Sequence, residues 1–281
     1  MPPPPVLEVG VADFAATLRL TRFDCRFVLP LSLDTGPGLP ARVRGAWGHA
    51  LKRRADMGDA EAAAALAVLF GMGNNGQKPF HIEADDEGAE LAIGLTLIGM
   101  ADRWRDVAFE SFAAALCDPP GLAHGAGANA KRKPLRMIGA AWRRTDGSLL
   151  MQPDQPLRLN FLTPFRTGPA DRMIVDHSYL LVAAAQRSIA MARWSGLSLI
   201  AGLGEVRDLG RAIQYDDSGL RPVAWSRNSS RQGGCAKAMN GFAGHLLLLR
   251  YPEQVTTLLQ LAEALHVGAQ TSLGLGRFKF F

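Results

Sequence analysis

A histidine set among cations is the clearest candidate for chemistry in this chain of 281 residues. The pattern from Pro40 to Arg54 predicts a helix. At about 100° per residue, Arg42, His49 and Arg53 fall on one face of that helix, with Lys52 at its edge. Such a face can bind a phosphate and move a proton, because histidine titrates near neutral pH. A solvated basic face with an incidental histidine is the simpler alternative.

A glycine-rich segment near the C-terminus is the strongest candidate for binding. Residues 265–280 run from the end of an expected helix, through Gly268, Gly274 and Gly276, into a short final strand. Glycines let backbone N–H groups approach an anion, and the flanking Arg277 adds positive charge, so the loop suits a phosphate backbone. Rossmann and Walker loops are excluded, because both need a strand before the glycines and a helix after them. A plain turn of the chain is the alternative.

The remaining histidines and cysteines limit the other kinds of chemistry. His81, on an expected edge strand, is a weaker catalytic candidate than His49, and His266 is expected to have a structural or RNA-contacting role. No HxH or HExxH motif and no acidic cluster with ligand spacing occurs, so we expect no metal and no cofactor. Neither a GxSxG elbow nor an RNP sequence occurs. Three widely spaced cysteines argue against a disulfide framework and a zinc ribbon.

Composition favours a cytoplasmic protein with an anionic partner. Hydrophobic residues make up 48% of the chain, which is enough for a core, and the net charge is +5. Mild excess positive charge favours a polyanion without proving one. The sequence has no signal peptide pattern and no apolar run near the roughly 20 residues that span a bilayer.

The order of elements in the second half predicts a ferredoxin-like β-α-β-β-α-β domain. Alternation of apolar and polar residues indicates strands, and apolar residues at helical spacing indicate helices. The expected elements are a strand from Leu157 that Thr163-Pro164 ends, a helix Asp171–Arg193, paired strands Pro222–Ser229 and Gly241–Arg250, a helix from Pro252 and a strand Arg277–Phe281.

The first half fits the same order, so we expect an α+β fold of two tandem ferredoxin-like domains, residues 1–150 and residues 151–281. No residue-level repeat supports the duplication, which rests on element order. The expected elements are strands Leu18–Leu29, Phe80–Glu83, Glu90–Ile98 and Leu135–Arg144, and helices Pro40–Arg54, Ala60–Phe70 and Trp104–Leu116.

Four motifs, in the right order along the chain, resemble the CRISPR-associated endoribonucleases of the RAMP superfamily that process precursor CRISPR RNA. Each motif is weak alone, but the ordered set is specific. The motifs are the helix start Val43–Leu51, the strand Leu159–Arg166, the segment Ser229–Gln232 followed by Gly241–Gly244, and the glycine loop from Leu265 to Phe278.

The resemblance implies recognition of the CRISPR repeat RNA, usually as a hairpin, and one metal-independent cut that leaves a 2′,3′-cyclic phosphate and a 5′-hydroxyl. It implies His49 as base or acid, with Arg42, Arg44, Lys52 and Arg53 as stabilising cations. An alternative within the family is cleavage by cations alone, for which Arg22, Arg44 and Arg231 are candidates. The expected RNA contacts are Arg53, Lys131, Arg132, Lys133, Arg227, Arg231, Gln232, His266, Gly268, Gln270, Thr271, Ser272, Gly274, Gly276 and Arg277.

Two other functions stay open at the level of sequence. RAMP proteins also bind crRNA without cutting it, as subunits of CRISPR effector complexes, and the glycine loop would be present in either case. Metabolite binding by the same fold is a third possibility, which the basic clusters disfavour. From the resemblance we also expect retention of the cleaved crRNA and partners among the other CRISPR effector subunits.

Overall fold

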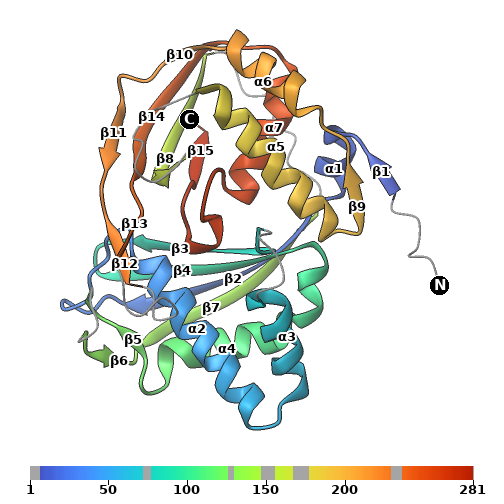
Figure 1. Cartoon of the computed structure of the whole chain (residues 1–281). Helices are drawn as coiled ribbons and strands as arrows, with labels where there is room; N and C mark the ends of the chain where they lie inside the picture. Colours follow the sequence, from blue (N-terminus) through green and yellow to red (C-terminus); the bar gives the residue numbers. More distant parts are fainter. Residues whose placement is uncertain are drawn as a thin grey trace.

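Two antiparallel sheets, each covered by helices on one side, make up the computed structural model of the chain (Figure 1). The structure describes residues 7–71, 77–125, 130–146, 156–166, 177–228 and 236–280. The expected boundary near residue 150 lies outside these ranges. Among the described residues, no helix is both long enough and apolar enough to cross a membrane.

The N-terminal sheet has the strand order β3-β4-β2-β7, and all of its neighbours are antiparallel. In chain order the strands of this sheet are β2, β3, β4 and β7. In space the third strand lies between the first and the second, and the fourth lies on the other side of the first, which is the ferredoxin-like arrangement. The elements are β2 (Arg19–Val28), α2 (Leu39–Asp56), α3 (Ala60–Phe70), β3 (Phe80–Asp86), β4 (Glu90–Ile98), the 3₁₀ turn η1 (Gly99–Trp104), α4 (Arg105–Cys117) and β7 (Met137–Asp146), with a small hairpin of β5 (Leu122–Ala123) and β6 (Arg132–Lys133).

The core of this half lies between the sheet and α2, α3 and α4. Trp47 of α2 is fully buried, and its ring meets the edges of Phe70, Phe80 and Phe112 at centroid distances of 5.0, 5.0 and 6.0 Å. Aromatic pairs prefer this edge-to-face geometry. The apolar face expected for the helix therefore fixes α2 on the sheet and turns its cationic face outward.

The C-terminal sheet has the order β10-β14-β8-β15, with β11 also paired to β14, which is again the ferredoxin-like arrangement. The expected fold class is thus confirmed. The elements are β8 (Leu157–Phe165), α5 (His177–Arg193), β9 (Leu197–Leu199), α6 (Leu203–Ala212), β10 (Gln214–Asp216), β11 (Leu220–Val223), β12 (Ser226–Asn228), β13 (Ala236–Ala238), β14 (Gly241–Arg250), α7 (Gln254–Leu265), the 3₁₀ turn η3 (Thr271–Leu273) and β15 (Phe278–Phe280).

Two expected elements of this half are wrong in detail. Strand β8 does not end at Thr163 but continues to Phe165. Its segment from Phe161 to Phe165 is longer than the segment of β14 opposite it, and Pro164, which has no N–H, lies in this bulge. The single strand expected over 222–229 is two strands. β11 pairs with β14 only as far as Val223 opposite Gly241, and β12 then pairs with β13.

The first described segment packs on the C-terminal half. β1 (Leu7–Val9) pairs in parallel with β9, and α1 (Val11–Thr17) buries Phe14 against the ends of α5 and α7. The sequence pattern indicates neither element. The two halves are therefore joined at this edge as well as through the glycine loop, which descends from α7 onto β3 (Figure 1).

Candidate nucleic-acid interface

The glycine loop after α7 is bent by a series of left-handed backbone positions. φ is 61° at His266, 88° at Gly268, 64° at Gln270, 80° at Gly274 and 71° at Gly276. A Cβ at Gly274 would lie 2.5 Å from the carbonyl oxygen of Ile82 on β3 and 2.7 Å from Cβ of Pro40 on α2. The loop can therefore lie between β3 and the first turn of α2 only because this position has no side chain.

Hydrogen bonds from the end of β8 fix the shape of the loop. Thr163 donates its hydroxyl to the Gly274 carbonyl at 2.7 Å and accepts from the Arg277 N–H at 2.9 Å. The N–H of Gly276 donates to the Pro164 carbonyl, and that of Ala269 to the Arg166 carbonyl, both at 3.0 Å. The expected strand Leu159–Arg166 and the expected glycine loop thus form one unit, although the residues that these hydrogen bonds join are more than 100 positions apart in the sequence.

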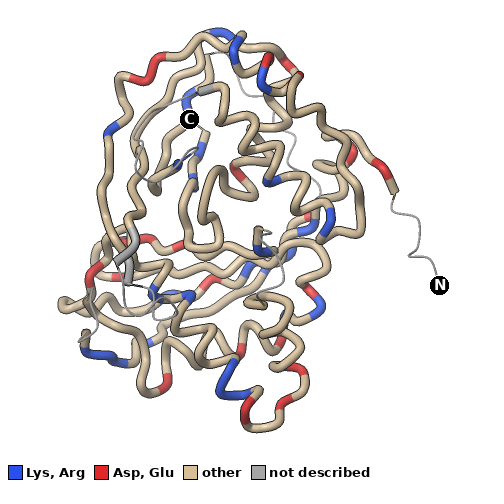
Figure 2. Tube along the Cα trace, viewed as in Figure 1, with Lys and Arg blue, Asp and Glu red and all other residues tan. Residues whose placement is uncertain are grey.

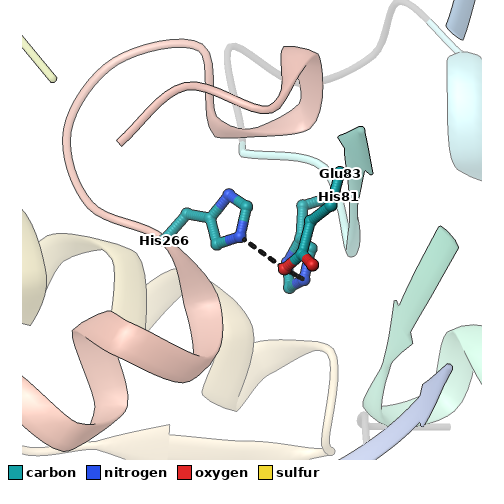
Figure 3. A group of neighbouring side chains, drawn as sticks. All are labelled: His81, Glu83 and His266. Carbon is teal, nitrogen blue, oxygen red and sulfur yellow. Dashed lines mark hydrogen bonds and ion pairs between the residues drawn. The ribbon is translucent and has the colours of Figure 1, made fainter. Parts of the chain in front are cut away.

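His81, Glu83 and His266 come together where the loop meets the N-terminal sheet (Figure 3). His81 and Glu83 are two residues apart on β3, so both side chains point to the same side of the sheet. His266 reaches them from the end of α7, with its Nε2 at 3.1 Å and the Nε2 of His81 at 3.6 Å from Oε1 of Glu83. The exposed fractions are 2% for His81, 8% for Glu83 and 0% for His266, so the group is buried.

Arginines neutralise the second oxygen of Glu83. Nη1 of Arg22 on β2 lies 2.5 Å from Oε2, after the side chain has crossed β4 above Gly94. A Cβ at Gly94 would be 2.7 Å from Nη2 of Arg22, so glycine is what opens this path. Arg277 of the loop lies 3.4 Å from the same Oε2 and donates Nη1 to both oxygens of Asp85, at 2.6 and 2.8 Å.

The burial of this group governs its protonation. Desolvation lowers the pKa of both histidines, against the attraction of Glu83, so each imidazole is neutral at neutral pH. Desolvation alone would raise the pKa of Glu83. The hydrogen bond from His266 and the charges around it outweigh that effect and hold the pKa well below the usual range. The carboxylate is therefore charged and shared between two imidazoles and two guanidinium groups.

Two histidines and a carboxylate are also a frequent ligand set for zinc. Here the imidazole rings are stacked, with centroids 3.9 Å apart and planes only 19° from parallel. A metal lies close to the plane of each imidazole that binds it, and two nearly parallel planes do not meet within bonding distance. Oε2 of Glu83 is also already paired with arginine. The arrangement suits a hydrogen-bonded junction better than a metal centre.

Arg187 of α5 completes the junction between the halves. It is fully buried and donates to the carbonyls of Leu265 and Lys78 at 3.1 and 2.9 Å. Desolvation lowers its pKa to about 9. One guanidinium thus ties α5 to the end of α7 and to the segment that enters β3.

The predicted catalytic face of α2 is on the surface, and its members have different partners. His49, Lys52 and Arg53 are exposed, and Lys52 pairs with Asp56 at 2.8 Å. Arg42 pairs with Asp34 at 3.1 Å, and the guanidinium of Arg44 lies 5.1 Å from the centre of the Phe70 ring. Arg22 is not on this face but in the buried junction. His49 lies about 13 Å along the helix axis from Pro40, where the loop contacts α2, at 1.5 Å per residue.

The predicted RNA contacts in the loop divide into two groups. Gly268, Gln270 and Ser272 are partly exposed. The buried members hold the loop in place, and they are His266, Thr271, Gly274, Gly276 and Arg277.

The other predicted contacts lie away from the loop. Lys131, Arg132 and Lys133 are exposed at β6, where Figure 2 shows a continuous stretch of positive charge. Arg227 is in β12, but its side chain is outside the described part of the structure, and Arg231 and Gln232 lie outside the described residues altogether.

Glu83, Asp85 and Arg187 were not among the candidates from the sequence. A signal for the first two was present: His81, Glu83 and Asp85 alternate along a strand and must share one face of the sheet. The partners of that face come from the distant loop, and no local pattern indicates them. Arg187 was hidden in a helix rich in alanine and leucine.

A family model described as "CRISPR-associated endoribonuclease Cas6" matches residues 159–278. The match runs from the third residue of β8 to the first residue of β15 and includes the whole glycine loop. Comparison with curated protein sequences gives no significant match.

Solved structures of Cas6 proteins resemble the whole chain. A Cas6 (TTHB231) product complex matches with a TM-score of 0.58 and 19% identity, over 93% of this chain and 99% of that one. A Cas6 (TTHA0078) product complex gives 0.56 and 17%, over 94% and 99%. The Thermus thermophilus Cas6 (TTHB231) gives 0.55 and 17%, over 95% and 100%. At these identities the likeness establishes the fold.

Proposed function

We propose that the chain is a metal-independent endoribonuclease of the Cas6 type that cleaves precursor CRISPR RNA within the repeat, because the Cas6 family model matches its C-terminal part over residues 159–278. The solved structures that resemble it include Cas6 complexes with a product and with a substrate mimic, which supports an RNA substrate.

The observation that carries the proposal is the position of the glycine loop. It belongs to the part of the chain that the Cas6 family model matches, yet it lies against the first turn of α2 in the other half, at Pro40. The partly exposed positions of the loop and the exposed cationic face of α2 are therefore connected through the contact between the loop and the start of that helix. That combination provides for the binding of a phosphate backbone beside a histidine.

The proposed reaction is an internal transesterification. A base removes the proton of the 2′-hydroxyl, its oxygen forms a bond to the adjacent phosphorus, and the bond to the 5′-oxygen breaks as an acid protonates that oxygen. A 2′,3′-cyclic phosphate and a 5′-hydroxyl result. We propose His49 as the base or the acid, and Arg42, Arg44 and Lys52 as cations that stabilise the charged phosphorane.

The exposure of His49 supports a catalytic role for it, and the position of Arg22 distinguishes this arginine from the proposed cations. His49 lies on the surface of α2, where RNA can reach it, whereas Arg22 is committed to Glu83 and Asp24 in the junction. In the proposed enzyme Arg22 therefore acts at a distance, by holding the sheet face that positions the loop. The set based on Arg22, Arg44 and Arg231 is the alternative to His49.

The proposed RNA contacts are the partly exposed Gly268, Gln270 and Ser272 of the loop, the cations Arg53, Arg227 and Arg231 with Gln232, and the basic hairpin at β6. The buried His266, Thr271, Gly274, Gly276 and Arg277 contribute by fixing the loop. We further propose that the protein acts in the cytoplasm, keeps its crRNA and meets other CRISPR subunits.

The test is cleavage of a labelled repeat RNA, from a CRISPR array of the same genome, in excess EDTA. Wild type is compared with His49→Ala and with His245→Ala, which removes another exposed histidine, on β14. We expect wild type and His245→Ala to cut once and leave a cyclic phosphate. We expect His49→Ala to cut about 10²–10⁴-fold more slowly with binding unchanged.

Three other outcomes of this experiment would change or contradict the proposed function. Unchanged cleavage by His49→Ala would move the chemistry to the arginines. Repeat RNA that wild type binds but never cuts would indicate a non-catalytic crRNA-binding subunit. No salt-dependent affinity for RNA at all would contradict the proposal, because phosphate contacts weaken as salt rises.

A further inference from the structure

Strand β7 is unusual for an edge strand because it is largely exposed along its length. Its only neighbour in the described part of the chain is β2. Positions 140–144 are all exposed, so side chains on both faces of the strand reach the solvent. A strand without cover on either face, and free along one edge, offers a surface for a partner.

Trp142 is the dominant apolar side chain on this strand. It is 57% exposed and pairs with Phe23 of β2, which places it on the helix side of the sheet. The guanidinium carbon of Arg105, at the start of α4, lies 5.2 Å from the centre of its ring. A cation on one face of an exposed indole is attracted by the ring and helps to fix its orientation.

Exposed cations lie at the two ends of the stretch of residues 131–143, with Arg143 beside Trp142 and the others before the strand and on the hairpin that precedes it. Lys131, Arg132, Lys133 and Arg136 are exposed, and none has a carboxylate within 4.0 Å among the described residues. Arg143 is 67% exposed, with a distant contact of 3.9 Å to Asp24. From Arg136 to Trp142 the strand spans about 20 Å at 3.3 Å per residue, a length that several nucleotides cover.

We propose that this β7 strip, consisting of Lys131, Arg132, Lys133, Arg136, Trp142 and Arg143, is a track for single-stranded RNA along the edge of the sheet, where Trp142 and Arg143 extend from opposite faces, with one base stacked on Trp142. The proposal rests on the proposed function and extends it: the strip takes the unpaired stretch of precursor that continues beyond the repeat hairpin. Exposed cations bind the phosphates, and the indole takes an unstacked base.

The chemistry of the strip favours single-stranded RNA over its competitors. Bases in a duplex are stacked inside the helix, so an aromatic side chain selects single strands, where bases can be splayed out. A partner protein would leave five exposed cations to be neutralised by its own carboxylates, whereas a nucleic acid supplies one phosphate per nucleotide. Stacking without sequence preference suits a spacer, whose sequence varies.

The test compares two RNAs, the repeat hairpin alone and the hairpin with a single-stranded extension on either side, by fluorescence anisotropy. The variants are Trp142→Ala, Trp142→Phe and Tyr179→Ala. Tyr179 is a matched control, since it is 40% exposed and also lies beneath an arginine, Arg207 at 5.1 Å. We expect Trp142→Ala to weaken binding of the extended RNA about tenfold and to leave the hairpin unchanged. Trp142→Phe retains most of the affinity, and Tyr179→Ala all of it.

A 2-aminopurine scan along the extension adds a direct readout. We expect quenching at one position in wild type and its loss in Trp142→Ala, with the melting temperature unchanged. Equal affinity of wild type and Trp142→Ala for the extended RNA would overturn the proposal, and a loss that is the same for both RNAs would do so too. If wild type fails to bind the repeat, an oligouridine separates the questions. If wild type binds the oligouridine more tightly than Trp142→Ala does, the proposed RNA track is supported although the proposed function fails. If the two bind it equally, both the track and the proposed function are contradicted.

Discussion

His266 Nε2 lies 3.1 Å from Oε1 of Glu83, and this contact joins the last helix of the C-terminal half to the edge strand of the N-terminal sheet. Arg22 and Arg277 approach the other oxygen of the same carboxylate, at 2.5 and 3.4 Å. One buried carboxylate therefore receives groups from two strands of its own sheet and from the distant glycine loop. The position of the loop on α2 depends on this junction.

Removal of Glu83 is expected to destabilise the protein strongly. Glu83→Ala leaves the guanidinium of Arg22 beside Arg277 without their shared partner, and loss of one member of a buried pair typically costs 3–5 kcal/mol. Urea unfolding measures the change. Glu87→Ala is the matched control, because Glu87 pairs with Arg26 on the surface, and such pairs contribute about 0–1 kcal/mol. Equal stability of the two variants would contradict the role assigned to the junction.

Acid is expected to weaken the fold through the stacked histidines. The pKa of His81 and that of His266 are both lowered from 6.5, so as the pH falls below about 6.5 the unfolded chain binds protons that the folded chain does not. Stability is therefore complete above that pH and declines below it. Glu83, whose pKa is lowered from 4.5, adds a further loss below about pH 4.5.

The measurement is urea unfolding at intervals between pH 8 and pH 5. In His81→Asn with His266→Asn the slope between pH 6.5 and pH 5 is expected to diminish, since the groups that titrate are gone. Replacement of the exposed His245 by Asn should leave the slope as it is. A wild-type stability that is constant from pH 8 to pH 5 would refute the assignment of neutral, buried imidazoles.

Gly94 is expected to contribute to stability because the side chain of Arg22 crosses directly above it. In Gly94→Ala the new Cβ would lie 2.7 Å from Nη2 of Arg22, which must then leave Glu83. We expect a loss of about 1–3 kcal/mol. Gly139→Ala on β7 is the control, since nothing lies within 4 Å of its Cβ position, and it should change stability by less than about 0.5 kcal/mol. In Arg22→Ala the added cost of Gly94→Ala should shrink, because coupled residues are not additive.

Gly274 is expected to be required for RNA cleavage because of the close contacts at its Cβ position, and not only because of its left-handed backbone conformation. In Gly274→Ala the Cβ meets the Ile82 carbonyl at 2.5 Å and Pro40 at 2.7 Å, so the loop must leave α2. Gly58 also has a left-handed φ, of 92°, but nothing lies within 4 Å of its Cβ position. Gly58→Ala should therefore cost about 1 kcal/mol of strain and leave cleavage intact. Gly274→Ala should slow cleavage at least tenfold at saturating protein. Equal cleavage rates for the two variants would contradict a role for the contact between the glycine loop and α2.

The sequence predicts those parts of the fold that local periodicity determines. Helix 60–70 and strands 90–98 and 241–250 agree with the structure residue for residue, because the apolar pattern of each is complete within the segment. The short elements β1, β9 and β13 could not be found in this way. Each has three residues and exists because a partner strand, distant or in the next hairpin, completes its hydrogen bonds.

The site was predictable to the extent that its residues lie on one helix or in one loop. The helix from Pro40 and the loop from Gly268 to Gly276 were identified, and the structure brings them into contact. Glu83 was missed because its importance depends on His266, 183 residues later, and on Arg22, which reaches it across another strand. Such a junction is a property of tertiary packing, and no sequence spacing encodes it.

The proposal that this chain cuts RNA by attack of a 2′-hydroxyl is tested most directly by cleavage of repeat RNA with a single 2′-deoxy nucleotide before the scissile phosphate. Wild type is incubated in EDTA with this RNA and with the all-ribose RNA. We expect both RNAs to bind with the same affinity and only the all-ribose RNA to be cut. Cleavage of the deoxy RNA at the same bond would show that another nucleophile attacks and would contradict the proposed mechanism.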